Sequence, residues 1–411
     1  MHPDATSYLH AFLDIGEALL CSGAEIFRVE DTINRMGYAC GAAQMNVFVI
    51  TSSIVITMEL PDSNARTQTR RIRSAGGNDF AKLEKLNDLS RRFCANPMTV
   101  DELRNEIDII NRKKPSVIGQ LAGSILAAFS FAIFYGGNIT DGIVAAIAAV
   151  IIWAAQIWLR PVCMNGVTFQ FVVSFITGCF ICAMKLLFPS LHMDKIMIGD
   201  IMLLIPGLMS THAIRDILIG DTISGVMRFI EAMLLAAVLA LGFIGAICLF
   251  RYIYQTEINF MIKTQLFIQL ITAAAGSIGF GLLFHIRKRY LGLVGIGGMI
   301  GWLAYVFFAG IWEGVFLPSL AAGFIVDIYA EILARVCKET STSFFVTSII
   351  PLVPGSTLFY CMSSIVEGNS QMALMYGRDT FYFALGIAVG MSAAWSICYF
   401  GRTVRKKQDA G

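Results

Sequence analysis

The sequence predicts an α-helical multi-pass membrane protein whose ten transmembrane helices form two inverted five-helix repeats, preceded by a cytoplasmic α/β domain. Three observations carry this prediction. The 411 residues are 56% hydrophobic and only 15% charged, whereas a soluble domain has about 25% charged residues. Apolar stretches of roughly 20 residues, the length that crosses a bilayer, recur after residue 116. Two of these stretches are interrupted by a Pro-Gly pair at equivalent positions.

The N-terminal region, residues 1–115, has the pattern of a small α/β domain. Helical periodicity, strand-like runs of Val, Ile and Thr and the capping sequence Thr99-Val-Asp-Glu102 mark its elements. We expect two helices, three strands and two further helices, at about 8–20, 24–36, 44–51, 53–60, 67–74, 80–93 and 99–111. The polar, acidic start of the chain is unlike a signal peptide, so we expect this domain to stay in the cytoplasm.

The rest of the chain contains ten apolar spans. They lie at about 117–135, 139–159, 168–188, 196–217, 226–250, 262–284, 291–309, 313–334, 343–364 and 379–400. Lys and Arg concentrate before the first span and after the even-numbered spans, so the positive-inside rule places both termini in the cytoplasm. We expect the spans to lie in the inner cell membrane. Because five spans per half is an odd number, the halves 116–255 and 256–411 are expected to be inverted relative to each other.

The two Pro-Gly pairs break the fourth and ninth spans near their middles. They lie at Pro206-Gly207 and Pro354-Gly355, and 355 − 207 = 148. A break frees backbone N–H and C=O groups that hydrocarbon cannot satisfy, and the restarting half-helix attracts a carboxylate. We therefore expect a substrate site at Pro206, Gly207, Ser210, Thr211, Pro354, Gly355, Ser356 and Thr357. Alternatively, the breaks are packing kinks whose hydroxyl groups bond back to their own helix.

Acidic residues inside spans are costly and are usually functional. Asp200 in the fourth span is the first candidate for a proton-coupling carboxylate, and Asp327 and Glu331 in the eighth span are the second. Asp327, Glu331 and Arg335 follow one helix face, so they also fit an ion-paired helix end that reaches the cytoplasm.

Two polar segments are candidates for a gate. Arg215, Asp216, Gly220 and Gly225 lie in a glycine-punctuated loop that could latch onto the α/β domain, or that could be an ordinary loop with helix caps. Glu25, Arg28 and Glu30 begin the second helix of the α/β domain, where Glu25 and Arg28 fit an i,i+3 ion pair.

Signals for an enzyme or a bound metal are missing from the sequence. It contains no phosphate-binding loop, no nucleophile elbow and no HExxH motif. Its one CxxC, Cys179 to Cys182, lies on an apolar helix without neighbouring ligands and fits packing better than metal binding. We therefore expect no catalytic residue, cofactor or metal, and no nucleic-acid partner.

Several segments resemble the threonine/serine exporter family. They are SGAEIFRVEDTINRMG (22–37), VFVITSSIVITMEL (47–60), TQTRRIRSAGGNDFAKLEKLNDLSRR (67–92) and the run from IPG through IRDILIGDTISGVMRFIEA (205–232). The resemblance covers nearly the whole chain. It places nine residues in family motifs without assigning their roles: Glu25, Arg28, Glu30, Pro206, Gly207, Arg215, Asp216, Gly220 and Gly225.

The resemblance implies an antiporter that exports small hydroxy amino acids, threonine or serine, driven by the proton gradient. In that family the soluble region with the first five spans forms one module, and the last five spans form the second. A two-protein branch of the family is associated with dicarboxylates such as succinate. A dicarboxylate exporter, a non-transporting membrane sensor with the α/β domain as effector, and a facilitated channel therefore stay open, as does association into a homo-oligomer.

Overall fold

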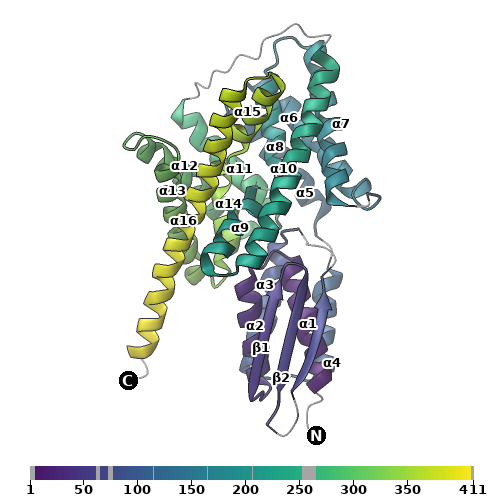
Figure 1. The fold of residues 1–411 in the computed structure, drawn as a ribbon, viewed down its shortest axis with the longest axis vertical. Coiled ribbons are helices and arrows are strands. Elements are labelled where there is room, and N and C mark those ends of the chain that lie inside the picture. Colours follow the sequence, from purple (N-terminus) through teal and green to yellow (C-terminus); the bar gives the residue numbers. More distant parts are fainter. Residues whose placement is uncertain are drawn as a thin grey trace. The chain divides into compact units, whose positions relative to one another are not determined.

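The computed structural model describes residues 5–61, 65–72, 77–113, 115–163, 165–205, 207–251 and 265–408. The chain divides into two compact units, and each is considered by itself. The first unit consists of Met1–Ser116 together with two short segments, Gly220–Met227 and Phe284–Arg287. The second unit contains the remaining residues, and its described part consists mainly of the apolar helices drawn in teal to yellow in Figure 1.

The first unit is an α/β fold whose elements follow the expected order. They are α1 (Ala5–Cys21), α2 (Ile26–Ala39), β1 (Gln44–Ile50), β2 (Ser53–Glu59), β3 (Arg66–Arg71), α3 (Phe80–Ala95) and α4 (Val100–Arg112). The strands form an antiparallel sheet in the order β1-β2-β3 (Figure 1). The third strand ends three residues before its expected end, and residues 73–76 lie outside the described residues.

The alternation of side chains along the strands determines how this unit packs. Met45 and Val49 on β1 and Ile54 and Ile56 on β2 are buried, whereas Phe48 on the opposite face is 53% exposed. Helices α1 and α2 pack on the sheet, and α3 and α4 pack on those helices. The expected capping box at Thr99 is present at the start of α4, so the local sequence signal sets that helix boundary.

The second unit consists of helices and of two short 3-10 turns, η1 (Lys288–Tyr290) and η2 (Ile350–Leu352). The helices are α5 (Val117–Phe134), α6 (Ile139–Trp158), α7 (Gly166–Leu187), α8 (Met193–Leu204), α9 (Gly207–Ile219), α10 (Thr222–Arg251), α11 (Leu266–Leu283), α12 (Leu291–Ala309), α13 (Phe316–Cys337), α14 (Ser341–Ile349), α15 (Gly355–Val366) and α16 (Ser370–Gln408). The first six residues of α10 belong to the first unit.

Among the described residues, eight helices are long and apolar enough to cross a membrane. The number is nine if α14–η2 and α15, which are bent by 44° at their junction, count as one broken span. The protein is therefore a multi-pass helical membrane protein, although ten spans are not established. The fourth expected span corresponds to α8 and α9, which flank Pro206, a residue outside the described ones.

The boundaries of the broken helices recur at a constant spacing in the two halves. Met193 begins α8 and Ser341 begins α14 (341 − 193 = 148), and the ends Leu204 and Leu352 are separated by the same interval. The following helices α10 and α16 begin 148 positions apart as well, at Thr222 and Ser370. The broken element is therefore repeated in local structure as well as in sequence.

A glycine turn follows each broken helix. Gly220 and Gly368, which are also 148 positions apart, have φ values of +109° and +75°. Glycine adopts this left-handed conformation without the steric cost that a Cβ imposes. Both turns end one apolar helix and allow the next, α10 or α16, to begin immediately.

Candidate functional site

The two helix breaks lie next to each other in the second unit. Helix α8 ends at Leu204, and Ile205 is extended. A Cβ atom built on Gly355, the first residue of α15, would meet the sulfur of Met202 and would lie 4.0 Å from the Cδ1 atom of Ile205. The beginning of α15 therefore rests on the last turn of α8, and the absence of a side chain at Gly355 allows this approach.

Backbone groups near the breaks have specific partners. The Gln170 side chain on α7 donates from Nε2 to the carbonyl oxygen of Leu204 at 2.7 Å. At the second break, the Val353 N–H donates to the carbonyl of Ile350 at 3.0 Å. The Gly355 N–H, the first of α15, donates to the Val353 carbonyl at 2.7 Å. The next N–H groups, those of Ser356 and Thr357, have no carbonyl acceptor one turn earlier in the same helix. They are the groups that an anion bound at this helix start would use.

Hydroxyl groups beside the second break are partly committed to the protein. Thr357 Oγ1 donates to the carbonyl of Pro354 at 3.2 Å. Thr380 Oγ1 on α16 donates to Thr357 Oγ1 at 2.9 Å. This is the back-bonded arrangement expected of a packing kink. Ser356 differs, because its side chain interacts with the hydroxyl group of Tyr135, the residue that follows α5. The Tyr135 oxygen also lies 4.0 Å from the Met202 sulfur.

The first break is described less completely. Thr211 on α9 is fully buried, and Gly207 begins that helix. Pro206 and the side chain of Ser210 lie outside the described residues. Of the eight expected substrate-site residues, the structure thus brings Gly355 and its neighbours in α15 to the end of α8.

A buried charged cluster lies on the same face of α8 as Met202. Lys195, two helical turns before Met202, is within 2.9 Å of an Asp194 carboxylate oxygen and donates to the Tyr360 hydroxyl on α15 at 3.1 Å. Its ammonium also lies 5.8 Å from the centre of the Tyr360 ring, and a second tyrosine, Tyr376 on α16, packs against that ring. The Lys195 and Asp194 side chains are only 4% and 9% exposed.

None of the candidate site residues predicted from the sequence belongs to this cluster. The available signal was the dipeptide Asp194-Lys195 directly before an apolar run, since buried charges require a partner. The sequence does not show the contact of Lys195 with Tyr360, because the two residues are 165 positions apart. The contact joins the first broken helix to the second.

The expected proton-coupling carboxylates are all buried. Asp200 on α8 is fully buried, and neither of its carboxylate oxygens has a hydrogen-bond partner among the described residues. Asp327 and Glu331 lie one turn apart on α13, with residue exposures of 6% and 2%. Arg335, one further turn along, is exposed, so the acidic pair and the arginine are in different environments.

The expected gate residues of the α9–α10 connection also make internal contacts. Arg215 and Asp216 on α9 are both 5% exposed, and Asp216 pairs with Arg228 on α10 at 2.9 Å. Gly220 forms the left-handed turn, and Gly225 is buried in the first turn of α10. The Asp216–Arg228 pair joins two consecutive helices of one unit, and a latch between these residues and the α/β unit remains a prediction.

The motif residues of the α/β unit form the expected ion pair and one unexpected bond. Glu25 and Arg28 are 3.3 Å apart in an i,i+3 pair. Glu30 accepts a hydrogen bond from the Val49 N–H on β1 at 2.9 Å, so it fixes α2 to the sheet. Burial raises the pKa of Glu30 above its usual range, the Val49 bond opposes this rise, and the negative charge of Asp221 adds to it.

The described residues form a multi-pass bundle in which discontinuous helices meet, an arrangement that is typical of transporters. No group of three or more His, Cys, Asp or Glu side chains within the described ranges is arranged to hold a metal ion. The family follows from sequence models. The model described as "Putative threonine/serine exporter" matches residues 10–250, and the model described as "Threonine/Serine exporter, ThrE" matches residues 269–397.

The chain therefore belongs to the threonine/serine exporter family, in a form that carries both modules in one polypeptide. Members of this family are transporters rather than enzymes. Comparison with curated proteins and with solved structures gives no match.

Proposed function

We propose that this protein exports threonine and serine from the cytoplasm, with the substrate held where the two helix breaks meet. The contact of Gly355 with Met202 and Ile205 is the observation that carries this proposal. Irregular backbone is tolerated at membrane depth only beside protein or a water-filled cavity. Two such segments at equivalent positions of the two halves make a substrate site from both repeats.

The chemistry around the breaks suits an amino acid. A carboxylate would be bound by the N–H groups of Ser356 and Thr357 in the first turn of α15. It would also be attracted by the cation Lys195, two helical turns away along α8, about 10 Å. Ser356 and Tyr135 supply hydroxyl groups for the substrate side chain. Asp194, which lies beside Lys195, disfavours a second carboxylate. The site therefore fits a zwitterion better than a dicarboxylate such as succinate.

Transport is proposed to be coupled to protons by exchange. Asp200 is the first candidate, because a buried carboxylate without a hydrogen-bond donor gains most from holding a proton. Asp327 and Glu331 are the second candidates, since they are buried on α13. A carboxylate that is protonated on one side of the membrane and ionised on the other would make the protein an antiporter.

The topology belongs to the same proposal. Helices α8 and α9 together form the fourth span and bring the number of spans to ten. The halves 116–255 and 256–411 are inverted repeats after an α/β domain at 1–115. The equal spacing of helix boundaries supports the repeat, and the two family models divide the chain between the same halves. The Lys and Arg pattern supports cytoplasmic termini in the inner membrane.

Efflux of labelled threonine from preloaded cells tests this function. Cells producing the protein are expected to release threonine faster than cells that lack it, and a proton uncoupler is expected to slow the release. Equal release from both cell populations would contradict an exporter. Uncoupler-insensitive release would retain transport but reject proton coupling.

A further inference from the structure

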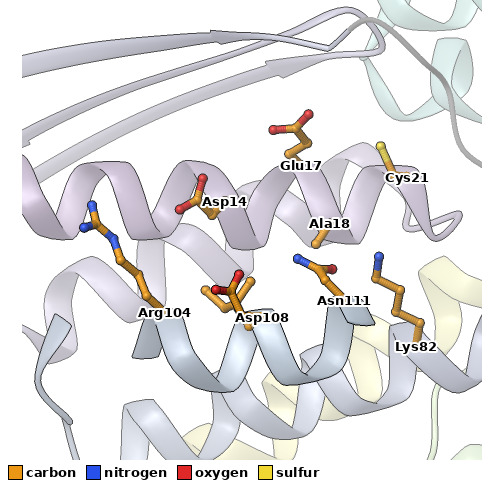
Figure 2. A pocket seen from close by; sticks show the side chains of 9 residues that line it. Asp14, Glu17, Ala18, Cys21, Lys82, Arg104, Asp108 and Asn111 are labelled. Atoms are coloured by element: carbon orange, nitrogen blue, oxygen red, sulfur yellow. The ribbon is translucent and has the colours of Figure 1, made fainter. Parts of the chain in front are cut away.

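The α/β unit contains a cavity of about 520 Å³ between α1, α3 and α4. This volume is within the range of small-molecule sites, about 300–1,000 Å³. Figure 2 shows Arg104, Asp108 and Asn111 projecting from α4 toward α1, with Lys82 of α3 beside them. All lining residues belong to one compact unit, so the cavity is a property of that unit alone.

The charged side chains that line this cavity differ in whether they form ion pairs with other described residues. Asp14 and Glu17 on α1 both pair with Arg70 on β3, at 2.9 and 2.7 Å. By contrast, the side chains of Lys82 and Arg104 form no ion pair or hydrogen bond within the part of the chain that the structure describes. The same is true of two polar side chains on α4 that also line the cavity, Asp108 and Asn111.

This arrangement selects the chemical class of the ligand. Lys82 and Arg104 are half-buried donors for a carboxylate, and Asp108 is an acceptor for an ammonium group. Three carboxylates in the lining disfavour a polyanion such as a nucleotide, and two cations disfavour a polyamine. A zwitterion presents one charge of each sign and fits both sets of groups.

We propose that this cavity is a regulatory site for a free amino acid, separate from the transport site. The proposal rests on the function proposed above, because the amino acid it senses is the exported substrate on the cytoplasmic side. Through this site, accumulated threonine or serine would raise the activity of its own exporter.

The unit that contains the cavity also includes the segment Phe284–Arg287, which connects in the chain to the apolar helices. Lys82 lies between two residues of α3 that hold the segment Phe284–Arg287. The Phe80 N–H donates to the Phe284 carbonyl at 3.1 Å, and the two rings pack edge to face at 5.7 Å. Glu84 forms an ion pair with Arg287. This segment follows α11 directly in the chain, so a shift of the first turn of α3 acts on the connection between α11 and α12.

Equilibrium binding of labelled L-threonine to the full chain in lipid nanodiscs tests the site. A background with Pro354→Ala and Gly355→Ala removes the break that the transport site requires. In that background, saturable threonine binding is expected to persist, and Lys82→Met or Arg104→Gln is expected to weaken it about ten- to a hundredfold, as for loss of a charge-assisted hydrogen bond. Asp108 is exposed, so Asp108→Asn is expected to weaken threonine binding less. Arg91→Gln on α3, outside the cavity, should leave threonine binding unchanged.

Two results would overturn the proposal: no saturable threonine binding in the background, or binding that the cavity variants leave unchanged. Succinate or ATP that displaces threonine from the cavity would reject the zwitterion class. Export is measured separately, so a chain that binds threonine in the cavity but exports none would contradict the proposed function and not the cavity.

Regulation requires one further readout. Export by the unmodified protein is expected to depend on internal threonine with a Hill coefficient above one. Phe284→Ala should keep the binding affinity of the cavity but reduce the coefficient to about one, since it removes the ring contact with Phe80. A coefficient that Phe284→Ala does not change would exclude coupling through this segment.

Discussion

Replacing Gly355 by alanine tests whether the contact between the two helix breaks controls transport. The backbone of Gly355 is outside the left-handed region, so alanine is not strained there by its own conformation. The new methyl group would overlap the Met202 sulfur and approach Ile205. Inserting a methyl group into a well-packed site costs about 1–3 kcal/mol. This cost lowers the equilibrium constant for forming the packed contact by about five- to 150-fold.

The cost of the new methyl group arises from its overlap with Met202, so shortening the Met202 side chain should relieve it. Met202→Ala removes the overlapping side chain, so we expect the double variant to export threonine faster than Gly355→Ala alone, with a coupling of about 0.5–3 kcal/mol. Gly292→Ala on α12 is the matched control, because a Cβ atom there meets no described atom within 4 Å. Initial export rates are measured per inserted molecule. Wild-type rates for Gly355→Ala, or equal defects in the single and double variants, would refute the reasoning.

Three further predictions concern charged side chains. Lys195→Met keeps the aliphatic stem but removes the partner of Asp194 and Tyr360, so it should reduce threonine export by at least tenfold. The matched variant Lys288→Met, at an exposed position, should have no effect, and equal export by both variants would exclude Lys195 from the site. Asp200→Asn should abolish the dependence of export on a pH gradient while insertion is unchanged, and export that keeps this dependence would place the coupling group elsewhere. In the α/β unit, the raised pKa of Glu30 means that the folded state holds a proton more tightly than the unfolded chain. The stability from this proton is therefore present at low pH and is lost as the pH rises through the raised pKa. Glu30→Gln keeps an acceptor for the Val49 N–H, so its gain in melting temperature over the wild type should be larger at pH 8 than at pH 4.5; an equal gain at both pH values would contradict this cause.

The sequence predicts elements well where local chemistry determines them. The Thr99 capping box and the Glu25–Arg28 pair depend on residues a few positions apart, and both are present. The Pro-Gly pairs predict the interrupted helices for the same reason, because proline and glycine act on the backbone beside them.

Long-range packing could not be read in this way. The contact of Gly355 with Met202 and the bond from Lys195 to Tyr360 join residues more than 150 positions apart. Periodicity shows that a helix is apolar but does not show which neighbour it faces, particularly in a bundle where most faces are apolar. The tyrosines of the site also resemble ordinary packing residues in the sequence, since their position beside a buried cation depends on the fold.

Threonine efflux from proteoliposomes that contain only the purified full-length chain tests the central claim most directly. With an imposed pH gradient, the wild-type chain is expected to export threonine and serine in preference to succinate. The variant with Pro354→Ala and Gly355→Ala is expected to lose this efflux while inserting normally. Efflux that is unaffected by this replacement, or a wild-type chain that transports none of these compounds, would contradict a substrate site at the paired helix breaks.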